Sequence, residues 1–394
     1  MIYLNQLGII CSLGKAPDEI KRHLLEQAQS GVALTGDYSP GRLLSLGRID
    51  PDLPLPPVDH LSLPGRSRNN QLALAALAEI RPAVDSAIEL YGSERIGIVI
   101  GTSTSGIAEG EAAMRRYTIT GKLPEHFHYG QQELGSLATA LATELGISGP
   151  AYVHSSACAS SAKALAGAAR LIRMRACDAV LTGGVDTLCA FTVAGFAALE
   201  SVSATRCNPL SRNRNGINIG EGAALFLMSR EPATVALLGW GESSDGHHMS
   251  APDPTGAGAR LAMERALSRA GIAAAQIDYV NLHGTGTVQN DAMEARVIDA
   301  LFSRAVAVSS TKPFTGHALG AAGAIEAGLC WLAMQDDNPS GKLPPHLWDG
   351  LADPTLPVLN VAEAGSCLGH PLRRVLSNSF AFGGANAALV LGRE

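Results

Sequence analysis

The chain has 394 residues, of which 46% are hydrophobic and 17% are charged. This length and composition allow a large buried core, so we expect a folded protein with two structural units rather than a disordered chain. The formal net charge of −6 and the lack of a long basic run argue against a nucleic-acid partner. The sequence contains no run of about 20 apolar residues, so we expect no membrane span.

The seven cysteines are scattered along the chain, and no two of them form a C-x-x-C pair. Zinc-ligand spacing is therefore absent, and the odd number argues against a fully paired set of disulfides. The first residues, MIYLNQLGIICSLG, lack the basic region and the cleavable apolar stretch of a signal peptide. We therefore expect a protein of the reducing cytoplasm that binds no metal.

Short apolar runs alternate with Ala/Leu-rich stretches, a pattern typical of an α/β protein. The sequence predicts a surface loop over the proline-rich residues 51–64. It predicts strands over residues 96–100, 179–181, 224–228, 279–282, 306–308, 375–376 and 388–391. It predicts helices over residues 71–80, 134–145, 160–174, 291–301 and 321–334. Several strands end in Gly, Ser, Thr or His, and the carboxyl edge of a sheet usually carries the chemistry.

A break in the pattern at Glu231 and Pro232 separates two strand-like runs. We divide the chain there, into residues 1–232 and residues 233–394. The two parts have a similar order of elements but no visible sequence repeat. Duplication is therefore a hypothesis about the fold alone.

Cys158 lies in HSSACASSA, between a β-rich run and an Ala-rich helical run. The thiol is then expected at a strand-to-helix turn, where the helix dipole favours the nucleophilic thiolate. The alternative is a buried structural cysteine, and this segment alone does not decide between the two. For Cys177, Cys189, Cys330 and Cys367, which lack such a context, the structural interpretation is favoured.

Two histidines lie in glycine-rich segments that are expected at strand ends. His283 lies in NLHGTGT, and His317 lies in KPFTGHALGAAG. A lone histidine is usually structural or metal-binding, but two in such loops favour a shared site. Neither segment has the H-E-x-x-H form or nearby Cys/Asp spacing of a metal site.

The ACASSA cysteine, the HGTGT histidine and the K-x-x-x-G-H-x-L-G-A-A-G histidine occur in this order in β-ketoacyl-acyl carrier protein synthases. The segments GEGA at 220–223, MSAP at 249–252 and NSFAFGGAN at 378–386 also resemble that family, so the likeness runs over essentially the whole chain. It is greatest to the elongating, Cys-His-His type. The resemblance implies the α/β thiolase fold, with two duplicated βαβαβαββ halves in a five-layer αβαβα arrangement, normally dimeric.

The resemblance implies a decarboxylative condensation in two stages. Cys158 accepts an acyl group from acyl carrier protein, with the backbone N–H groups of Cys158 and Phe382 as the oxyanion hole. Malonyl-acyl carrier protein then loses carbon dioxide, while His283 and His317 donate hydrogen bonds to its thioester oxygen. The resulting carbanion attacks the acyl-cysteine and gives a β-ketoacyl product, so no metal or organic cofactor is needed.

The same resemblance assigns Lys312 and Glu326 to the electrostatics of the site, as a cation and its partner carboxylate. By themselves, these two residues would be interpreted as surface charges. Phe382 is expected to gate an acyl pocket in which Ile107 and Phe380 contact the acyl chain. An aromatic residue between glycines is otherwise interpreted as core filler.

The substrate is expected as a phosphopantetheine thioester on an acidic carrier protein. Because the chain is negative overall, attraction to that carrier requires a local basic patch. Arg66, Arg68 and Arg206 lie in segments that resemble carrier contacts, with a solvated surface role as the alternative. His128 and Tyr129 lie in a region that lines the far end of the pocket, with an exposed loop as the alternative.

Residues 208–217, NPLSRNRNGI, stand where many relatives have an R-P-F-D-x-x-R-D-G-F-like stretch. This departure and the segments MIYLNQLGIICSLG and SRNNQL resemble synthases of bacterial aryl polyene pathways, with saturated fatty-acid elongation as the alternative. A degradative thiolase would have a second catalytic cysteine, and an initiating synthase would have Asn in place of His317. A chain-length factor usually lacks the nucleophile, so Cys158 favours an active subunit. That subunit is expected in a homodimer, or in a heterodimer with a related synthase-like chain.

Overall fold

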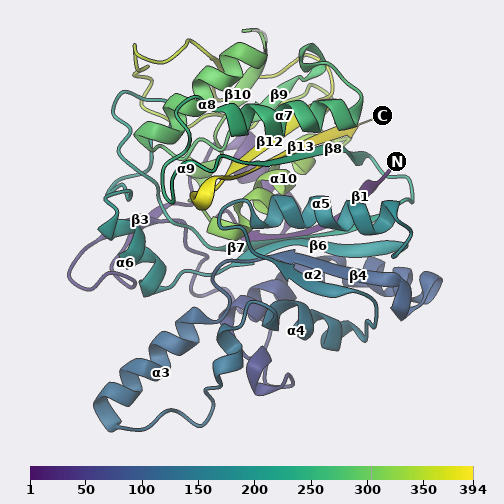
Figure 1. Ribbon diagram of the computed structural model, residues 1–394, viewed down its shortest axis with the longest axis vertical. Helices are drawn as coiled ribbons and strands as arrows, with labels where there is room; N and C mark the ends of the chain where they lie inside the picture. Colours follow the sequence, from purple (N-terminus) through teal and green to yellow (C-terminus); the bar gives the residue numbers. More distant parts are fainter. Residues whose placement is uncertain (303, 394) are drawn as a thin grey trace.

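The computed structural model describes residues 1–302 and 304–393. Its helices are α1 (Pro17–Lys21), α2 (Arg68–Tyr91), α3 (Ile107–Thr120), α4 (Ser136–Leu145), α5 (Ser160–Arg173), α6 (Ala190–Ala198), α7 (Ala257–Ala270), α8 (Val288–Leu301), α9 (Lys312–Thr315) and α10 (Ala322–Ala333). Its strands are β1 (Tyr3–Cys11), β2 (Ala33–Thr35), β3 (Leu44–Leu46), β4 (Ile96–Gly101), β5 (Ala151–His154), β6 (Ala179–Asp186), β7 (Gly222–Ser229), β8 (Val235–Ser244), β9 (Tyr279–Asn281), β10 (Ala307–Ser309), β11 (Asn360–Val361), β12 (Arg374–Phe380) and β13 (Ala385–Arg393). Apart from the hairpin of β2 and β3, the strands in this range form one hydrogen-bonded series (Figure 1).

The two halves of that series repeat the same strand order. The first half runs β1-β7-β6-β4-β5, and the second runs β8-β13-β12-β9-β10 with β11 added at its edge. When the strands of each half are numbered along the chain, both orders read 1-5-4-2-3. The halves are joined where Tyr3 of β1 pairs with Ala236 of β8. The hypothesis of a duplicated fold is therefore confirmed at the level of topology.

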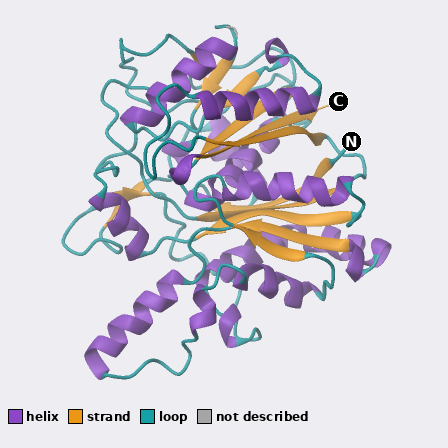
Figure 2. Ribbon diagram, in the orientation of Figure 1, coloured by secondary structure: helices purple, strands orange, loops and turns teal. Residues whose placement is uncertain are grey.

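Helices lie outside and between the two half-sheets, as Figure 2 shows. Helices α2 and α4 pack on the first half-sheet, and α7 packs on the second with α8 beside it. Helices α5 and α10 contact each other and strands of both half-sheets, so they form a central layer (Figure 1). This is the five-layer αβαβα arrangement of the thiolase fold that the sequence predicts. No helix in the described part of the chain has the length and apolar character needed to cross a bilayer.

Every predicted strand and helix overlaps an observed one of the same type, and most boundaries shift by a few residues, but α2 continues to Tyr91, far beyond its predicted end at residue 80. Strand β1 was not predicted, although its second half is buried on both faces at the junction of the half-sheets. Helix α3 was also missed, because most of its side chains are exposed and it lacks an apolar stripe. The boundary after residue 232 falls between β7 and β8. As a division into two domains it stays a prediction, because the halves share the strand series and the central layer.

The central layer depends on close contact between α5 and α10. A Cβ atom added at Gly323 of α10 would lie 2.8 Å from Oγ of Ser379 and 3.1 Å from the backbone nitrogen of Ala162. Glycine is therefore needed at position 323 because any side chain would push α10 away from α5 and β12. The small residues of the sequence SSAKALAGAA in α5 serve the same close packing.

We expect Gly323→Ala to lower the free energy of unfolding by about 1–3 kcal/mol, because the added methyl group overpacks the central layer. The matched control is Gly195→Ala in α6, where an added Cβ meets nothing within 4 Å. That control should leave stability unchanged or raise it by about 0.4–1 kcal/mol. Thermal unfolding of both variants tests this, and an equal effect of the two substitutions would contradict it.

Candidate active site

The predicted catalytic residues meet at the carboxyl ends of parallel strands. Strands β4, β5 and β6 are parallel in the first half, and β9, β10 and β12 are parallel in the second. Cys158 follows β5, His283 follows β9, and Lys312 follows β10. A cavity of about 90 Å³ opens where these ends meet. Its walls include Cys158, Phe196, His283, His317, Phe380 and Phe382.

Cys158 lies on a sharp turn between β5 and α5. The residue before it, Ala157, has a φ of +46°, in the left-handed region that residues other than glycine rarely adopt. The hydroxyl of Ser160 stabilises the turn, because it donates to the carbonyl of Ala157 at 2.6 Å and accepts from the N–H of Ser156 at 2.8 Å. The turn thus places the thiol at the cavity wall, as the sequence predicted.

The ionisation of Cys158 differs from the prediction. Burial raises the pKa of the thiol to about 11, although the charge of Lys312 and a hydrogen bond from the backbone N–H of Phe382 both lower it. The loss of water around the sulfur therefore outweighs the favourable start of α5. This shift favours a neutral Cys158 thiol at neutral pH, in contrast to the thiolate that the helix start predicted.

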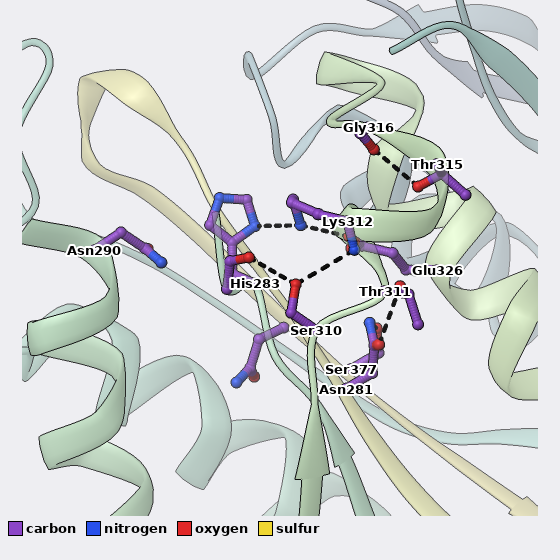
Figure 3. A network of polar contacts seen from close by, with 12 residues as sticks. Asn281, His283, Asn290, Ser310, Thr311, Lys312, Thr315, Gly316, Glu326 and Ser377 are labelled. Atoms are coloured by element: carbon purple, nitrogen blue, oxygen red, sulfur yellow. Dashed lines mark hydrogen bonds and ion pairs between the residues drawn. The ribbon is translucent and has the colours of Figure 1, made fainter. Parts of the chain in front are cut away.

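Lys312, Glu326 and His283 form a buried polar chain beside the cavity (Figure 3). The ammonium group of Lys312 pairs with Oε1 of Glu326, and its Nζ lies 3.4 Å from Nδ1 of His283. With Lys312 as the donor, Nδ1 of His283 accepts, so the imidazole proton stays on Nε2. Burial raises the pKa of Glu326 to about 7, although Lys312 beside it opposes this shift. The structure therefore brings together the three residues that the sequence linked only by resemblance.

The two histidines lie next to each other, with ring centroids 5.3 Å apart and ring planes at 83°. Burial and the charge of Lys312 hold the pKa of both His283 and His317 well below the usual value. Both imidazoles are thus neutral at pH 7, which the sequence did not determine. A neutral imidazole with a proton on Nε2 is a hydrogen-bond donor to an oxygen in the cavity.

Backbone contacts hold His317 against the first half of the chain. Its N–H donates to the carbonyl of Asn218 at 2.6 Å, and its carbonyl accepts from the N–H of Gly220 at 2.9 Å. These contacts join Gly220, the first residue of the GEGA segment, to the loop of His317. Nδ1 of His317 is buried and has no hydrogen-bond partner among the described residues.

Two buried carboxylates that position the site were not predicted. Glu294 of α8 accepts hydrogen bonds from the backbone N–H groups of His283 and Gly284, both at 2.8 Å. Asp186, at the end of β6, accepts from the backbone N–H groups of Ser103 at 2.8 Å and Gly320 at 2.6 Å. Asp186 therefore joins loops of both halves. Nothing in the local sequence marks either carboxylate as buried, so only the tertiary contacts reveal them.

The predicted acyl-contacting residues have mixed positions. Phe380 lies against His283, and Phe382 lies against Phe196, with ring centroids 5.7 Å and 5.5 Å apart. Ile107 is half-buried at the start of α3 and is not part of the wall of the catalytic cavity. The roles of Phe380, Phe382 and Ile107 stay predictions.

His128 and Tyr129 do not line the catalytic cavity of this chain. Both are exposed, and Tyr129 keeps 71% of its surface accessible. Nδ1 of His128 instead accepts a hydrogen bond from the N–H of Gly130, within the loop itself. The alternative of an exposed loop therefore describes the single chain, and a role for these residues requires a second subunit.

The three predicted carrier-contacting arginines differ in their availability. Arg206 is exposed and makes no polar contact within the described part of the chain. Arg66 is half-buried and donates to the backbone carbonyls of residues 59 and 61. The guanidinium of Arg68 forms two hydrogen bonds, at 2.8 Å and 3.2 Å, with the buried carboxylate of Glu221. This internal ion pair makes Arg68 a weaker carrier contact than the sequence suggested.

The described residues contain no group of three or more His, Cys, Asp or Glu side chains arranged to hold a metal ion. The polar chain of His283, Lys312 and Glu326 is built from an imidazole, an ammonium group and a carboxylate. These groups suit proton placement and electrostatic stabilisation of an oxygen that gains negative charge. The cavity thus combines a thiol nucleophile with hydrogen-bond donors.

Comparison with known proteins agrees with this chemistry. Residues 69–233 match the model of the N-terminal domain of β-ketoacyl synthases, and residues 234–347 match that of the C-terminal domain. The 3-oxoacyl-[acyl-carrier-protein] synthase 2 of Staphylococcus aureus is 30% identical over 353 residues, covering 84% of this chain and 86% of that protein.

Solved structures are similar over the whole chain. In the complex of the ketosynthase ApeO with its chain length factor ApeC from Xenorhabdus doucetiae, the matching chain is 45% identical, with a TM-score of 0.93. That match covers 100% of this chain and 98% of the other chain. The ishigamide ketosynthase/chain length factor matches with 26% identity and a TM-score of 0.88, covering 100% of this chain and 99% of the other chain.

The raised pKa of Cys158 predicts slow alkylation at neutral pH, with a rate that rises about tenfold per pH unit to above pH 9. An unperturbed thiol would level off near its pKa of about 8.5. Lys312→Met should slow alkylation further, because it removes the cation that lowers the pKa of the thiol. Mass spectrometry can follow iodoacetamide labelling of Cys158, with the exposed Cys367 as an internal reference. If the labelling rate of Cys158 levels off below pH 8, the thiolate that the sequence predicted is correct.

Proposed function

Because the chain belongs to the β-ketoacyl synthase family, we propose that it extends acyl chains by condensing them with malonyl-acyl carrier protein. The reaction joins an acyl group on Cys158 to the two-carbon unit left by malonyl decarboxylation. The observation that carries this proposal is the single cavity in which a thiol meets two neutral histidines. Beside it, the buried pair of Lys312 and Glu326 holds the ammonium group of Lys312 next to His283.

In the first stage, the sulfur of Cys158 displaces the phosphopantetheine thiol from the acyl group. The new carbon–sulfur bond forms on Cys158, the old one breaks, and the proton of Cys158 ends on the departing thiol. The backbone N–H of Phe382 is close enough to the sulfur of Cys158 to lower the pKa of the thiol. Together with the N–H of Cys158, it is placed to bind the oxygen that becomes negative in the tetrahedral intermediate.

In the second stage, the carbon–carboxylate bond of the malonyl group breaks, and its electron pair moves toward the thioester carbonyl. The oxygen of that carbonyl gains negative charge, which His283 and His317 stabilise as neutral hydrogen-bond donors. Lys312 lies behind His283 and adds a positive charge to the same side. Carbon dioxide leaves, and the enolate carbon attacks the acyl group on Cys158. The sulfur of Cys158 leaves as a thiolate when the β-ketoacyl product forms, and a proton from solvent restores the neutral thiol.

We further propose that the chain is the catalytic subunit of a heterodimer that builds aryl polyene chains. The support is the 45% identity to a chain of the ApeO–ApeC complex, and the presence of Cys158 favours the catalytic subunit over its partner. Strand β5 ends the strand series, so its outer edge has no neighbouring strand within the described residues. Such an edge suits pairing with a second subunit. We also infer a reducing, cytoplasmic location, in keeping with the free thiols of all seven cysteines.

Incubation with acyl-carrier thioesters should give one covalent adduct on wild type and none on Cys158→Ala, because Cys158 is the nucleophile. Intact-mass spectrometry measures the adduct, and a panel of aryl polyene and saturated chains measures the acyl preference. Cys330→Ala is the matched control and should load normally, because Cys330 lies outside the cavity. An adduct on Cys158→Ala would show that the nucleophile is assigned wrongly. Equal loading of both chain types would remove the aryl polyene proposal alone.

Substituting His283 or His317 by Ala should reduce decarboxylation of malonyl-acyl carrier protein by about 10²–10³-fold, because each supplies one donor to the enolate oxygen. Acyl loading of Cys158 should stay detectable in both variants. Release of labelled carbon dioxide measures the first step, and intact mass measures the second. Normal decarboxylation in both variants would rule out this role.

A further inference from the structure

A third histidine, His346, is buried behind the catalytic loops, outside the wall of the catalytic cavity. It follows α10 in the segment KLPPHLWD and keeps only 4% of its surface exposed. Its two ring nitrogens have different partners. Nδ1 accepts a hydrogen bond from the backbone N–H of Ser310 at 3.0 Å, and Nε2 donates to the carbonyl of Pro209 at 2.9 Å.

Ser310 connects His346 to the groups proposed for decarboxylation. Figure 3 shows Ser310 between His283 and Lys312. Its hydroxyl donates to the carbonyl of Gly284 at 2.6 Å and accepts from the backbone N–H of Lys312 at 3.3 Å. Gly284 directly follows His283 in the chain. Ser310 therefore fixes the spacing between the loops of His283 and Lys312, and His346 holds Ser310 from behind.

On its other side, His346 lies beside a set of hydrogen bonds that clamps residues 208–213, part of the segment 208–217 that departs from the family pattern. The carboxylate of Asp349 accepts from the hydroxyl of Ser211 at 2.9 Å and from the amide of Asn213 at 2.7 Å. The backbone N–H of Asp349 donates to the side-chain carbonyl of Asn208 at 3.0 Å. His346 contacts this segment through the carbonyl of Pro209 and the catalytic loop through the N–H of Ser310.

Both hydrogen bonds of His346 require one protonation state. Ser310 offers an N–H and Pro209 offers a carbonyl, so only the neutral imidazole with its proton on Nε2 satisfies both. Burial lowers the pKa of His346 to about 4, and the carbonyl of Pro209 opposes this shift. The ring therefore keeps this tautomer at neutral pH.

We infer that His346 is a positioning residue for decarboxylation, which acts through Ser310 to hold the His283 and Lys312 loops at their working distance. This inference rests on the proposed function and assigns it a residue outside the cavity. Acyl loading should depend on His346 much less, because Cys158 lies on the turn between β5 and α5, in the other half of the chain. Ser310 makes no hydrogen bond to that turn within the described residues.

Three substitutions separate the two hydrogen bonds of His346. His346→Asn places an amide oxygen near the position of Nδ1 and keeps the bond to Ser310. His346→Gln reaches the position of Nε2 and keeps the bond to Pro209, and His346→Leu removes both. The matched control is Asn338→Leu, because Asn338 is equally buried and anchors the neighbouring residues Ala333 and Lys342 without contacting Ser310.

We expect His346→Leu to reduce decarboxylation by about 10²-fold, the effect of misplacing a catalytic group by roughly 1 Å. Loading of Cys158 should fall much less than decarboxylation, because the charge of Lys312 only partly offsets the effect of burial on the thiol. His346→Asn should recover more decarboxylation than His346→Gln, and this order decides the question if the Leu variant does not fold. Asn338→Leu should lower the thermal midpoint without separating the two rates. Nitrogen NMR of the imidazole should show a proton on Nε2 throughout pH 5–8.

Equal losses of loading and decarboxylation in the His346 variants, or no loss of either, would overturn the inference. A ring that titrates near pH 6.5 or carries its proton on Nδ1 would also overturn it. A wild-type protein that loads and decarboxylates normally keeps the proposed function even when these variants show no separation. If the wild-type protein neither loads acyl groups nor decarboxylates malonyl-acyl carrier protein, the proposed function and the role of His346 are both wrong.

Discussion

The buried ion pair of Lys312 and Glu326 sets the electrostatics on which the rest of the site depends. Two charges out of water are stable only when they are paired closely, so α9 and α10 must keep these side chains in contact. The positive end of the pair faces His283 and helps to keep both histidines neutral. It also opposes, without overcoming, the rise in the pKa of the Cys158 thiol. Burial and one cation thus determine the resting protonation of every group proposed for catalysis.

The duplicated strand order explains how groups so far apart in sequence reach one cavity. Each half presents the carboxyl ends of three parallel strands, and the central layer of α5 and α10 holds these two edges together. The first half supplies the nucleophile, and the second supplies the donors and the ion pair. Asp186 joins loops from both halves with hydrogen bonds, and the backbone of His317 pairs with Asn218 and Gly220. The site therefore requires both halves, although each has its own hydrophobic core.

Because the two halves supply different groups, different contacts position the groups of the two chemical stages. The acylation centre depends on the strained turn at Ala157 and on the backbone of Phe382. The decarboxylation centre depends on Glu294 beneath His283 and, by our inference, on His346 behind Ser310. A change in one support need not disturb the other stage. The clamp on residues 208–213 also offers a physical link between the altered segment of this chain and its decarboxylation groups.

The sequence alone indicated several of the main strands and helices and the candidate reactive residues, but not β1 or α3. Apolar runs and glycine-rich strand ends are local patterns, so they indicated the predicted strands. The local pattern left the role of Cys158 open, and the motifs that resemble β-ketoacyl synthases led to the assignment of Cys158, His283 and His317. Only the tertiary structure decided that Cys158 is a neutral thiol and that the guanidinium of Arg68 is bound to Glu221. It also revealed the supporting roles of Glu294 and Asp186. Ionisation and pairing depend on burial and on tertiary contacts, such as the one between Arg68 and Glu221, which lie 153 positions apart in the sequence. No local pattern in a sequence records such contacts.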